Sequence, residues 1–165
     1  MIRLIVAMDQ MGGIAKQGYT PWSIPMDMAY FVTQTKSHGG KVLVGGITFR
    51  NSLKGKPLKG RTMYLLTKSD QAVDGVQIVH DLETWLKDQG TEDVWVIGGA
   101  NVFSQVMAAD LADELFITHI DADLHCDQFF PDYKEKFQLV SQSEPKEQNG
   151  FRFTFARYVR AKSTP

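Results

Sequence analysis

Val94-Trp-Val-Ile-Gly-Gly-Ala-Asn-Val-Phe103 is the stretch of sequence that decides the fold. Its first residues favour a β-strand, and from Ala100 onward the apolar residues follow helical spacing as far as Met107. The apolar run of the strand does not alternate with polar residues, as expected of a strand covered on both faces. A buried strand that passes through a glycine pair directly into a helix is typical of an α/β sheet.

Apolar runs of the same kind recur along the chain. Runs rich in β-forming residues lie at 2–8, 41–44, 62–66, 76–79 and 94–97. Helical candidates lie between several of them, at 25–36, 47–53, 81–88 and 101–108. Near the C-terminus there are three strand-like runs with no good helix between them, at 114–121, 137–142 and 151–159. The last run predicts an antiparallel hairpin at the edge of the sheet.

The expected architecture is therefore a single α/β domain over residues 1–165. Its sheet is mixed and mostly parallel, with about eight strands, and is flanked by about four helices. A length of 165 residues, with 43% hydrophobic and 22% charged residues, suits one domain with a real core.

Charge and cysteine content narrow the classes of function. A net charge of −1 without a basic cluster argues against nucleic-acid and membrane partners, and favours small-molecule chemistry. We expect a monomer. No apolar run is long enough for a signal peptide or a membrane span, which predicts a cytoplasmic protein. Cys126 is the only cysteine and has no further Cys or His at ligand spacing, so we expect a loop thiol and no metal site.

Asp27 lies in the first turn of the helix predicted from Pro25. An acid there often only caps free N–H groups. The other interpretation is a carboxylate at the edge of an apolar stripe, where desolvation raises the pKa and lets the group hold a proton. Helical spacing assigns four residues to this stripe: Met28, Phe31, Val32 and Thr35.

The residues before this helix favour the second interpretation of Asp27. Pro21, Trp22 and Pro25 stiffen the approach, and the glycines at 12, 13 and 18 make the stretch before them mobile. A flexible loop beside a fixed acid is typical of a lid over a site. No second acid is placed to pair with Asp27, which argues against glycosidase chemistry.

Two glycine pairs follow predicted strands, Gly45-Gly46 and Gly98-Gly99. Such a pair lets backbone N–H groups and a helix N-terminus approach a phosphate closely. Neither pair fits the G-x-G-x-x-G or the P-loop pattern, so a dinucleotide would be held in another way. Thr67-Lys68-Ser69 follows a predicted strand and either forms an ordinary turn or takes up a further phosphate, such as the 2′-phosphate of NADPH.

Across essentially its whole length the sequence resembles dihydrofolate reductase. Five segments carry the resemblance in the right order: Pro21-Trp-Ser-Ile-Pro-Met-Asp27, Lys56-Pro-Leu-Lys-Gly-Arg61, Val96-Ile-Gly-Gly-Ala100, Thr118-His-Ile-Asp121 and Phe129-Phe-Pro-Asp-Tyr133. The resemblance implies hydride transfer from NADPH to C6 of dihydrofolate and protonation at N5, giving tetrahydrofolate.

The resemblance also implies roles for individual residues. Asp27, assisted by Thr118, would bind the amino-pyrimidine edge of the pterin and promote protonation through a water that Trp22 helps to position. Arg61 would form a fork to the glutamate carboxylate of the substrate. The implied substrate-binding residues are Ile5, Ala7, Asp27, Met28, Phe31, Leu53, Leu58, Arg61, Ile97 and Thr118. The implied NADPH-binding residues are Ala7, Ile14, Gly45, Gly46, Thr48, Thr67, Lys68, Ile97, Gly98, Gly99, Ala100, Asn101, Val102, Phe103 and Gln105.

The sequence departs from the family pattern at two positions near the cofactor. Gly46 stands where the family usually has an arginine that meets the phosphates, and His80 stands where some members have a lysine. NADPH preference then depends largely on Thr67, Lys68 and Ser69.

Two other functions are compatible with some features of this sequence. A reductase of riboflavin synthesis has the same fold, but the Pro-Trp and Asp27 segment argues against it. A non-catalytic nucleotide-binding module would need none of Asp27, Thr118 and Arg61.

Overall fold

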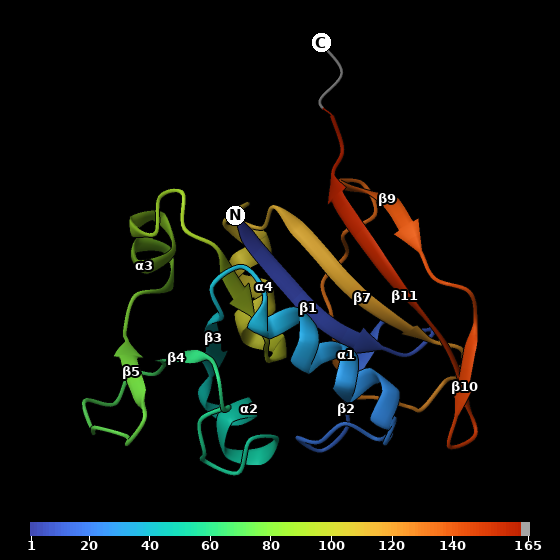
Figure 1. Ribbon diagram of the computed structural model, residues 1–165, viewed down its shortest axis with the longest axis horizontal. Coiled ribbons are helices and arrows are strands. Elements are labelled where there is room, and N and C mark those ends of the chain that lie inside the picture. Colours follow the sequence, from blue (N-terminus) through green and yellow to red (C-terminus); the bar gives the residue numbers. More distant parts are fainter. Residues whose placement is uncertain (163–165) are drawn as a thin grey trace.

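A nine-stranded sheet runs through the molecule in the computed structural model, which describes residues 1–162 (Figure 1). Eight strands lie side by side in the order β10-β11-β7-β1-β6-β3-β4-β5, and β9 also pairs with β11. Their bounds are β1 Ile2–Met8, β3 Lys41–Gly45, β4 Thr62–Leu66, β5 Val76–Val79, β6 Val94–Val96, β7 Glu114–Ile120, β9 Phe137–Gln142, β10 Lys146–Gln148 and β11 Phe151–Arg160. The eight predicted strands are confirmed, and the short β10 joins them.

In the series β7-β1-β6-β3-β4-β5, each strand is parallel to the next. The strand β11 runs antiparallel to β7, β9 and β10. The predicted C-terminal hairpin is thus confirmed at one edge of the sheet. In β3, Val42 and Val44 face one side of the sheet and Leu43 faces the other, and all three are buried. Burial on both faces explains why the predicted parallel strands read as continuous apolar runs.

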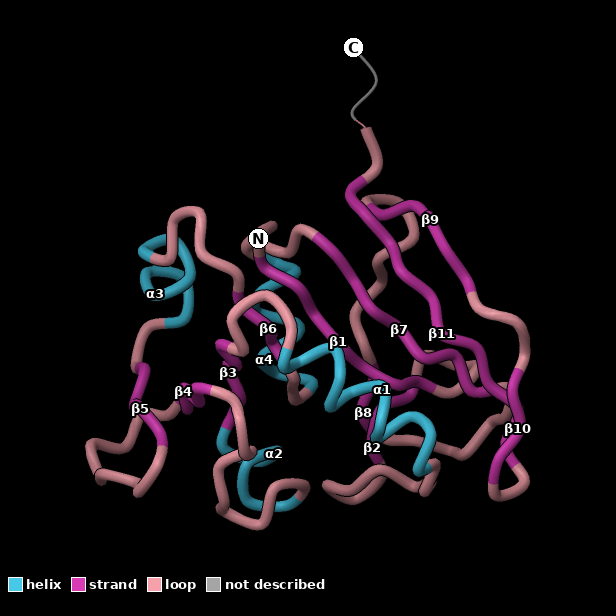
Figure 2. The backbone as a smooth tube through the Cα atoms, viewed as in Figure 1, coloured by secondary structure: helices cyan, strands magenta, loops and turns pink. Residues whose placement is uncertain are grey.

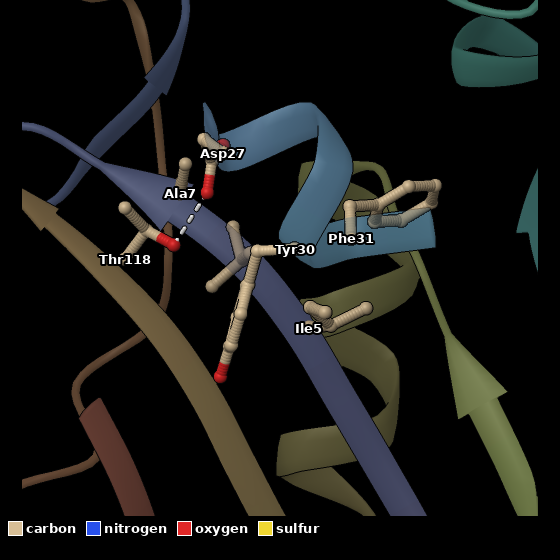
Figure 3. A pocket seen from close by; sticks show the side chains of 7 residues that line it. Ile5, Ala7, Asp27, Tyr30, Phe31 and Thr118 are labelled. Atoms are coloured by element: carbon tan, nitrogen blue, oxygen red, sulfur yellow. Dashed lines mark hydrogen bonds between the residues drawn. The ribbon is translucent and has the colours of Figure 1, made fainter. Parts of the chain in front are cut away.

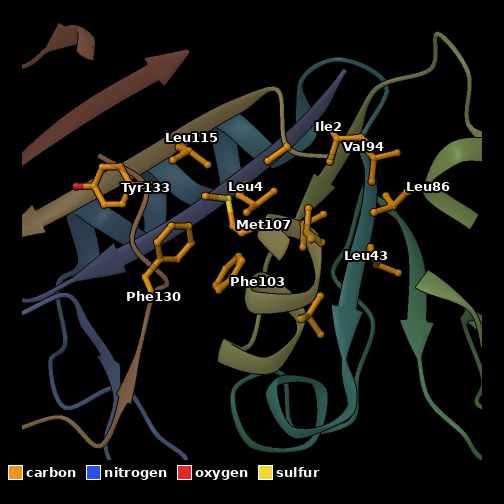
Figure 4. Close-up of a cluster of buried hydrophobic side chains, with 14 of the residues drawn as sticks. Ile2, Leu4, Leu43, Leu86, Val94, Phe103, Met107, Leu115, Phe130 and Tyr133 are labelled. Atoms are coloured by element: carbon orange, nitrogen blue, oxygen red, sulfur yellow. The ribbon is translucent and has the colours of Figure 1, made fainter. Parts of the chain in front are cut away.

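Four helices cover the two faces of the sheet (Figure 2): α1 Pro25–Lys36, α2 Gly46–Asn51, α3 Leu82–Asp88 and α4 Ala100–Ala108. Each face of the sheet has its own hydrophobic core, and two of the helices contribute to each core. Buried residues of α3 and α4 pack with Leu4, Leu43 and Leu115 on one face (Figure 4), and α1 and α2 lie over the other face with Ile5 and Val44. None of the described helices combines the length and apolarity that crossing a bilayer requires.

The N-terminus of α1 is held by the distant β10–β11 turn. Ile24 at the N-cap offers no side-chain acceptor, and the Met26 N–H donates instead to Oε1 of Gln148, with 2.6 Å between the atoms. Nδ2 of Asn149 donates to the carbonyl of Ser23 at 2.9 Å. The first turn of α1 is therefore fixed by tertiary contacts and not by a local cap.

The predicted apolar stripe of α1 is corrected by the structure. Thr35 is the only fully buried residue of this helix, and Met28 is 62% exposed. The side that faces the sheet carries Asp27, Tyr30 and Phe31, because α1 lies over a pocket at this point and not over a continuous core. The apolar spacing correctly predicts the helix, but it places the side that faces the sheet about one residue too far toward the C-terminus.

A second, two-stranded sheet ties the loop before α1 to the segment after β7. It pairs β2, Gly13–Ala15, with β8, Gln128–Phe129. Neither strand was predicted, because two or three residues are too few to show an alternating pattern. The glycine-rich stretch that suggested a mobile lid is thus hydrogen-bonded to a partner segment.

Candidate active site

The carboxyl ends of the parallel strands meet at one edge of the sheet, which is where α/β proteins bind ligands. Gly45 at the end of β3 is in register with Leu66 at the end of β4. Leu43 and Leu4 are both in register with Val96 at the end of β6. The segments that follow these strands, with Gly46, Thr67 and Ile97, therefore emerge side by side.

Asp27 and Thr118 meet at this edge although 91 residues separate them in sequence (Figure 3). Thr118 Oγ1 donates to Oδ1 of Asp27 at 2.6 Å. Thr118 lies near the carboxyl end of β7, in register with Ala7 of β1, and Asp27 reaches it from the first turn of α1. Within residues 1–162 the Asp27 carboxylate accepts only from Thr118 and from no N–H group of its own helix. The capping interpretation of Asp27 is therefore excluded.

Burial raises the pKa of Asp27 above its ordinary value, and the hydrogen bond from Thr118 lowers it by less. The carboxylate is half-buried in a pocket whose other walls are mainly apolar, so water solvates its charge poorly. A ligand that donates hydrogen bonds to this carboxylate would replace the missing solvation.

The pocket around Asp27 is lined by seven residues: Ile5, Val6, Ala7, Asp27, Tyr30, Phe31 and Thr118. Ile5, Ala7, Asp27, Phe31 and Thr118 were predicted as site residues, and the structure brings them together. Tyr30 and Val6 were missed. Tyr30 lies three residues after Asp27, a spacing that places both on one face of a helix, and this signal could have found it.

Tyr30 closes one side of the pocket. Its ring stacks on Phe155 of β11, with 4.0 Å between the ring centroids and 12° between the planes. Burial, and then the negative charge of Asp27, raise the pKa of Tyr30 to about 12. The hydroxyl therefore stays protonated at neutral pH.

Phe31 and Ile5 of the pocket also belong to a larger apolar cluster, which forms a wall beside the pocket. Leu53, Leu58 and Ile97, for which the sequence predicts substrate binding, are partly buried against the same cluster. Met28 lies at the exposed margin and Trp22 lies on the other side, in a cluster with Ala7 and Ile24. This wall suits an aromatic ligand that enters with its polar edge toward Asp27.

Arg61 is fixed between α1 and β4. Its Nε donates to the carbonyl of Lys59 and its Nη1 to Oγ1 of Thr35, each at 3.0 Å. Burial lowers the pKa of Arg61. Within residues 1–162 the guanidinium pairs with no carboxylate. Arg61 is therefore an oriented cation of the kind that can bind an anionic group.

The two glycine turns contact each other directly. The Gly45 N–H donates to the carbonyl of Gly98 at 2.8 Å, and the Gly98–Gly99 peptide is cis. A Cβ on Gly45 would lie 2.7 Å from Val102, and one on Gly99 would lie 2.8 Å from Oγ1 of Thr48. Glycine is thus favoured at both positions, because a Cβ would collide with the side chain of Val102 or of Thr48 unless that side chain moved.

The N-terminus of α4 is open toward these turns. Gly99 at its N-cap offers no side-chain acceptor, so the first N–H groups of the helix are available to an anion. Asn101 and Gln105 are exposed and hydrogen-bonded to each other, whereas the side chains of Val102 and Phe103 are buried. Val102 and Phe103 can therefore contact a ligand only through their backbone. The side chain of Ile14 is buried in the same hydrophobic cluster as these two residues.

Thr67 and Lys68 stand at the end of β4, and Lys68 is exposed. Thr67 Oγ1 accepts from the Ser69 N–H at 3.1 Å, and Nδ1 of His80 lies 2.7 Å from the Thr67 carbonyl. His80 also faces the carboxylate of Asp70, with 3.0 Å between Nε2 and Oδ1. The turn is ordered, and Lys68 makes no ion pair within residues 1–162.

Comparison with known proteins gives one consistent result. A family model described as dihydrofolate reductase matches residues 1–160. The chain is 32% identical to the dihydrofolate reductase of Bacillus subtilis (strain 168), over 99% of this chain and 97% of that protein. It is also 32% identical to the bifunctional dihydrofolate reductase-thymidylate synthase 1 of Arabidopsis thaliana, where the match covers 98% of this chain and 35% of that protein.

A solved structure agrees with these sequences. The dihydrofolate reductase of Enterococcus faecalis, complexed with NADP(H) and RAB-propyl, superposes with a TM-score of 0.83 at 27% identity, covering 98% of this chain and 97% of that one. The family model, the relatives and the shared fold together show that this chain belongs to the dihydrofolate reductase family.

Proposed function

We propose that the chain reduces 7,8-dihydrofolate to 5,6,7,8-tetrahydrofolate with NADPH, and that Asp27 and Thr118 hold the substrate during the reaction. The product supplies one-carbon metabolism and thymidylate synthesis. The observation that carries the assignment of residues is the half-buried Asp27 carboxylate, bound by Thr118 Oγ1 at 2.6 Å inside an apolar pocket.

The hydrogen-bonding capacity of this pair matches the amino-pyrimidine edge of a pterin. An ionised carboxylate has about four acceptor sites, and Thr118 uses only one of those on Asp27. Because the Thr118 hydroxyl donates its proton to Asp27, the threonine oxygen is left to accept an N–H from the ligand. Two neighbouring acceptors would therefore receive ring N–H and amino N–H donors together.

The same placement gives Asp27 an indirect role in proton transfer. A carboxylate that binds the amino-pyrimidine edge does not itself reach N5, so the proton arrives at N5 through a water. Burial raises the pKa of Asp27, which brings the group nearer to the range in which it exchanges protons with bound water and substrate. Trp22, packed beside Ala7, is placed to limit where that water lies.

The outer part of the substrate would contact the apolar wall and Arg61. Leu53 and Leu58 enclose the ring next to the pterin, and the Arg61 guanidinium binds the glutamate carboxylate. Because Lys59 and Thr35 already orient the guanidinium, little side-chain entropy is lost on binding.

NADPH, when bound, supplies the hydride that C6 of the substrate accepts. The glycine turns at 45–46 and 98–99 and the open N-terminus of α4 fit its pyrophosphate, because they offer backbone N–H groups without intervening side chains. Thr67 and Lys68 would hold the 2′-phosphate, and Thr48, Asn101 and Gln105 would contact the remainder. Ile14 and Ala7 would border the nicotinamide.

The test is a steady-state assay of the purified chain that follows the absorbance of the nicotinamide. NADPH should be oxidised only when dihydrofolate is added, and NADH should be a poorer donor. Turnover with a ribosylated pyrimidine instead of dihydrofolate would assign the chain to riboflavin synthesis. Binding of both ligands without turnover would make it a non-catalytic module.

The chain is proposed to act as a cytoplasmic monomer that binds these two small molecules and neither nucleic acid nor membranes. Its net charge of −1 supports this choice of partners. Size-exclusion chromatography with light scattering, with and without NADPH, tests the monomer, and a dimer mass would refute it.

A further inference from the structure

Asp9 is a buried acid outside the pocket to which the proposed reaction assigns no role. It is 2% exposed and follows directly after Met8, the last residue of β1. No arginine or lysine pairs with it within residues 1–162. A buried carboxylate without a cationic partner is costly and requires other donors.

Backbone N–H groups from two different loops supply these donors. Oδ1 accepts from Met11 in the loop after β1 at 3.0 Å and from Gly13, the first residue of β2, at 2.8 Å. Oδ2 accepts from Leu124 at 3.0 Å, in the loop after β7. We call this arrangement the Asp9 clasp: the Asp9 carboxylate and the three N–H groups of Met11, Gly13 and Leu124.

The clasp is ionised and closely packed. Burial acts to raise the pKa of Asp9, but the N–H groups of Leu124, Gly13 and Met11, together with the Cys126 thiol, outweigh burial and lower the pKa overall. A Cβ on Gly13 would lie 2.4 Å from Cβ of Cys126 and 2.9 Å from Oδ1 of Asp9. The two loops therefore contact each other at a spacing that only glycine permits.

The clasp is close in sequence to residues that line the pocket. Ala7 of β1 and Thr118 of β7 line the pocket and are partners in register. Asp9 comes two residues after Ala7, where β1 ends, and its bond to Leu124 joins the ends of the same two strands. Beyond the clasp, the first loop continues through Ile14 and Trp22 to α1 and Asp27.

The clasp also sets the direction of that loop. Asp9 donates its N–H to the Gly13 carbonyl at 2.9 Å, which closes a turn directly before β2. β2 then pairs with β8, and the Asp127 N–H donates to the Ala15 carbonyl at 3.0 Å. Ile14, between these contacts, is buried against the core.

We propose that Asp9 is a positioning residue of the reductase, whose carboxylate fixes the loop of Ile14 and Trp22 against the cofactor side of the pocket. This inference rests on the proposed function, since it assigns Asp9 to the geometry of that reaction. Asp9 does not touch the substrate. It acts through the backbone of residues 11–13, and its loss displaces the loop without removing any group that binds dihydrofolate.

The experiment compares wild type with Asp9→Asn, in which an NH₂ group replaces one acceptor and faces a backbone N–H. We expect kcat to fall about 10- to 100-fold, since a displacement of about 1 Å near reacting groups costs this much. The KM for NADPH should rise, and the KM for dihydrofolate should stay near the wild-type value because Asp27, Thr118 and Arg61 are intact. With NADPH deuterated at the transferred position, the isotope effect on kcat should increase.

Asp123→Asn is the matched control. Asp123 lies in the same second loop and is exposed, and its carboxylate accepts only from His125 within that loop, at 3.0 Å. This variant should retain wild-type kcat, both KM values and the isotope effect. Gly13→Ala disturbs the clasp from the other side while keeping the carboxylate, and should change the same constants as Asp9→Asn.

Each outcome decides one of the two proposals. If the wild type does not turn over dihydrofolate, the proposed function fails. If the wild type is active and Asp9→Asn, folded by circular dichroism, melts earlier but keeps its kcat and isotope effect, Asp9 is structural only and the inference is overturned. It is also overturned if neither Asp9→Asn nor Gly13→Ala folds.

Discussion

The Asp27 carboxylate must be charged to accept hydrogen bonds from the substrate, yet it lies where burial favours the neutral acid. Burial raises its pKa, and the bond from Thr118 opposes this only in part. Functional acids are commonly placed in such environments. Replacing such an acid is expected to lower the activity and to raise the stability of the fold.

Asp27→Asn should lower kcat by about 10²- to 10⁴-fold at neutral pH, the usual range for loss of an acid that promotes protonation. The rate should recover partly as the pH falls, because acid protonates the substrate in solution. Steady-state rates over a pH series provide the measurement, with the exposed Asp132→Asn as control. Wild-type turnover of Asp27→Asn across the series would remove Asp27 from the proton route.

The same variant should be more stable than wild type at neutral pH. The folded-state pKa of Asp27 is above the ordinary value of 3.8, so the stability that the neutral acid contributes is present below 3.8 and is lost as the pH rises through the folded-state pKa. Asparagine avoids this loss and can still accept from Thr118. The melting temperature should rise, by about 2 to 4 °C per kcal/mol gained, and the gain should vanish at low pH. A lower melting temperature at pH 7 would contradict the environment assigned to Asp27.

Arg61→Gln should raise the KM for dihydrofolate about 10- to 100-fold, the equivalent of one charge-assisted hydrogen bond. The kcat should change little, since the glutamate tail is far from the reacting atoms. Lys59→Gln is the control, because Arg61 contacts only the backbone carbonyl of Lys59. An equal rise in KM in both variants would indicate a general effect of positive charge.

At the scale of elements, the periodicity of the sequence predicted most boundaries well. The helix at 25–36 and the strand at 2–8 have the observed bounds, because Pro25 and a continuous apolar run mark them clearly. The β2–β8 sheet was not predicted, because each of its two strands is too short to show a periodic pattern in the sequence.

The site was predictable only in part from local sequence. The glycine turns and Asp27 have local signals, but the bond between Asp27 and Thr118 depends on the order of strands in the sheet. Gln148, which binds the first turn of α1, had no signal, because nothing near it in sequence indicates a helix N-terminus 122 residues away.

The turn after β4 carries the prediction about the cofactor. Lys68→Ala should raise the KM for NADPH about 5- to 10-fold, since an exposed ammonium loses a phosphate contact. The KM for NADH, which lacks the 2′-phosphate, should be unchanged. The exposed Lys87→Ala of α3 serves as control in the same assay with both nicotinamides. An equal effect on NADPH and NADH would refute the assignment of Lys68.

At the scale of the whole molecule, an ion network centred on the buried pair Arg3–Glu114 joins the edge hairpin to the parallel strands. Glu114 of β7 accepts from Arg3 of β1 at 3.0 Å and from Arg157 of β11 at 2.6 Å. Arg3 also pairs with Asp93 at 2.6 Å. Burial acts to raise the pKa of Glu114, but Arg157 and Arg3 together lower it below the ordinary value.

Glu114→Gln should reduce the free energy of unfolding by about 3 kcal/mol at pH 7, because Arg3 loses a buried partner. Since the folded-state pKa of Glu114 is lowered, its contribution is fully present above 4.5 and is lost as the pH falls through the folded-state pKa. The difference from wild type should therefore shrink in acid. Urea unfolding over a pH series measures this, with the exposed Glu135→Gln as control, and a pH-independent difference would contradict the linkage.

The bond between Met26 and Gln148 spans 122 residues. During synthesis on the ribosome, at about 5 to 20 residues per second, roughly 6 to 24 seconds pass between the two residues leaving the peptidyl-transferase centre. Throughout this interval the first turn of α1 lacks its acceptor. The nascent chain can assemble its parallel strands early, but the pterin anchor forms only when translation is nearly complete.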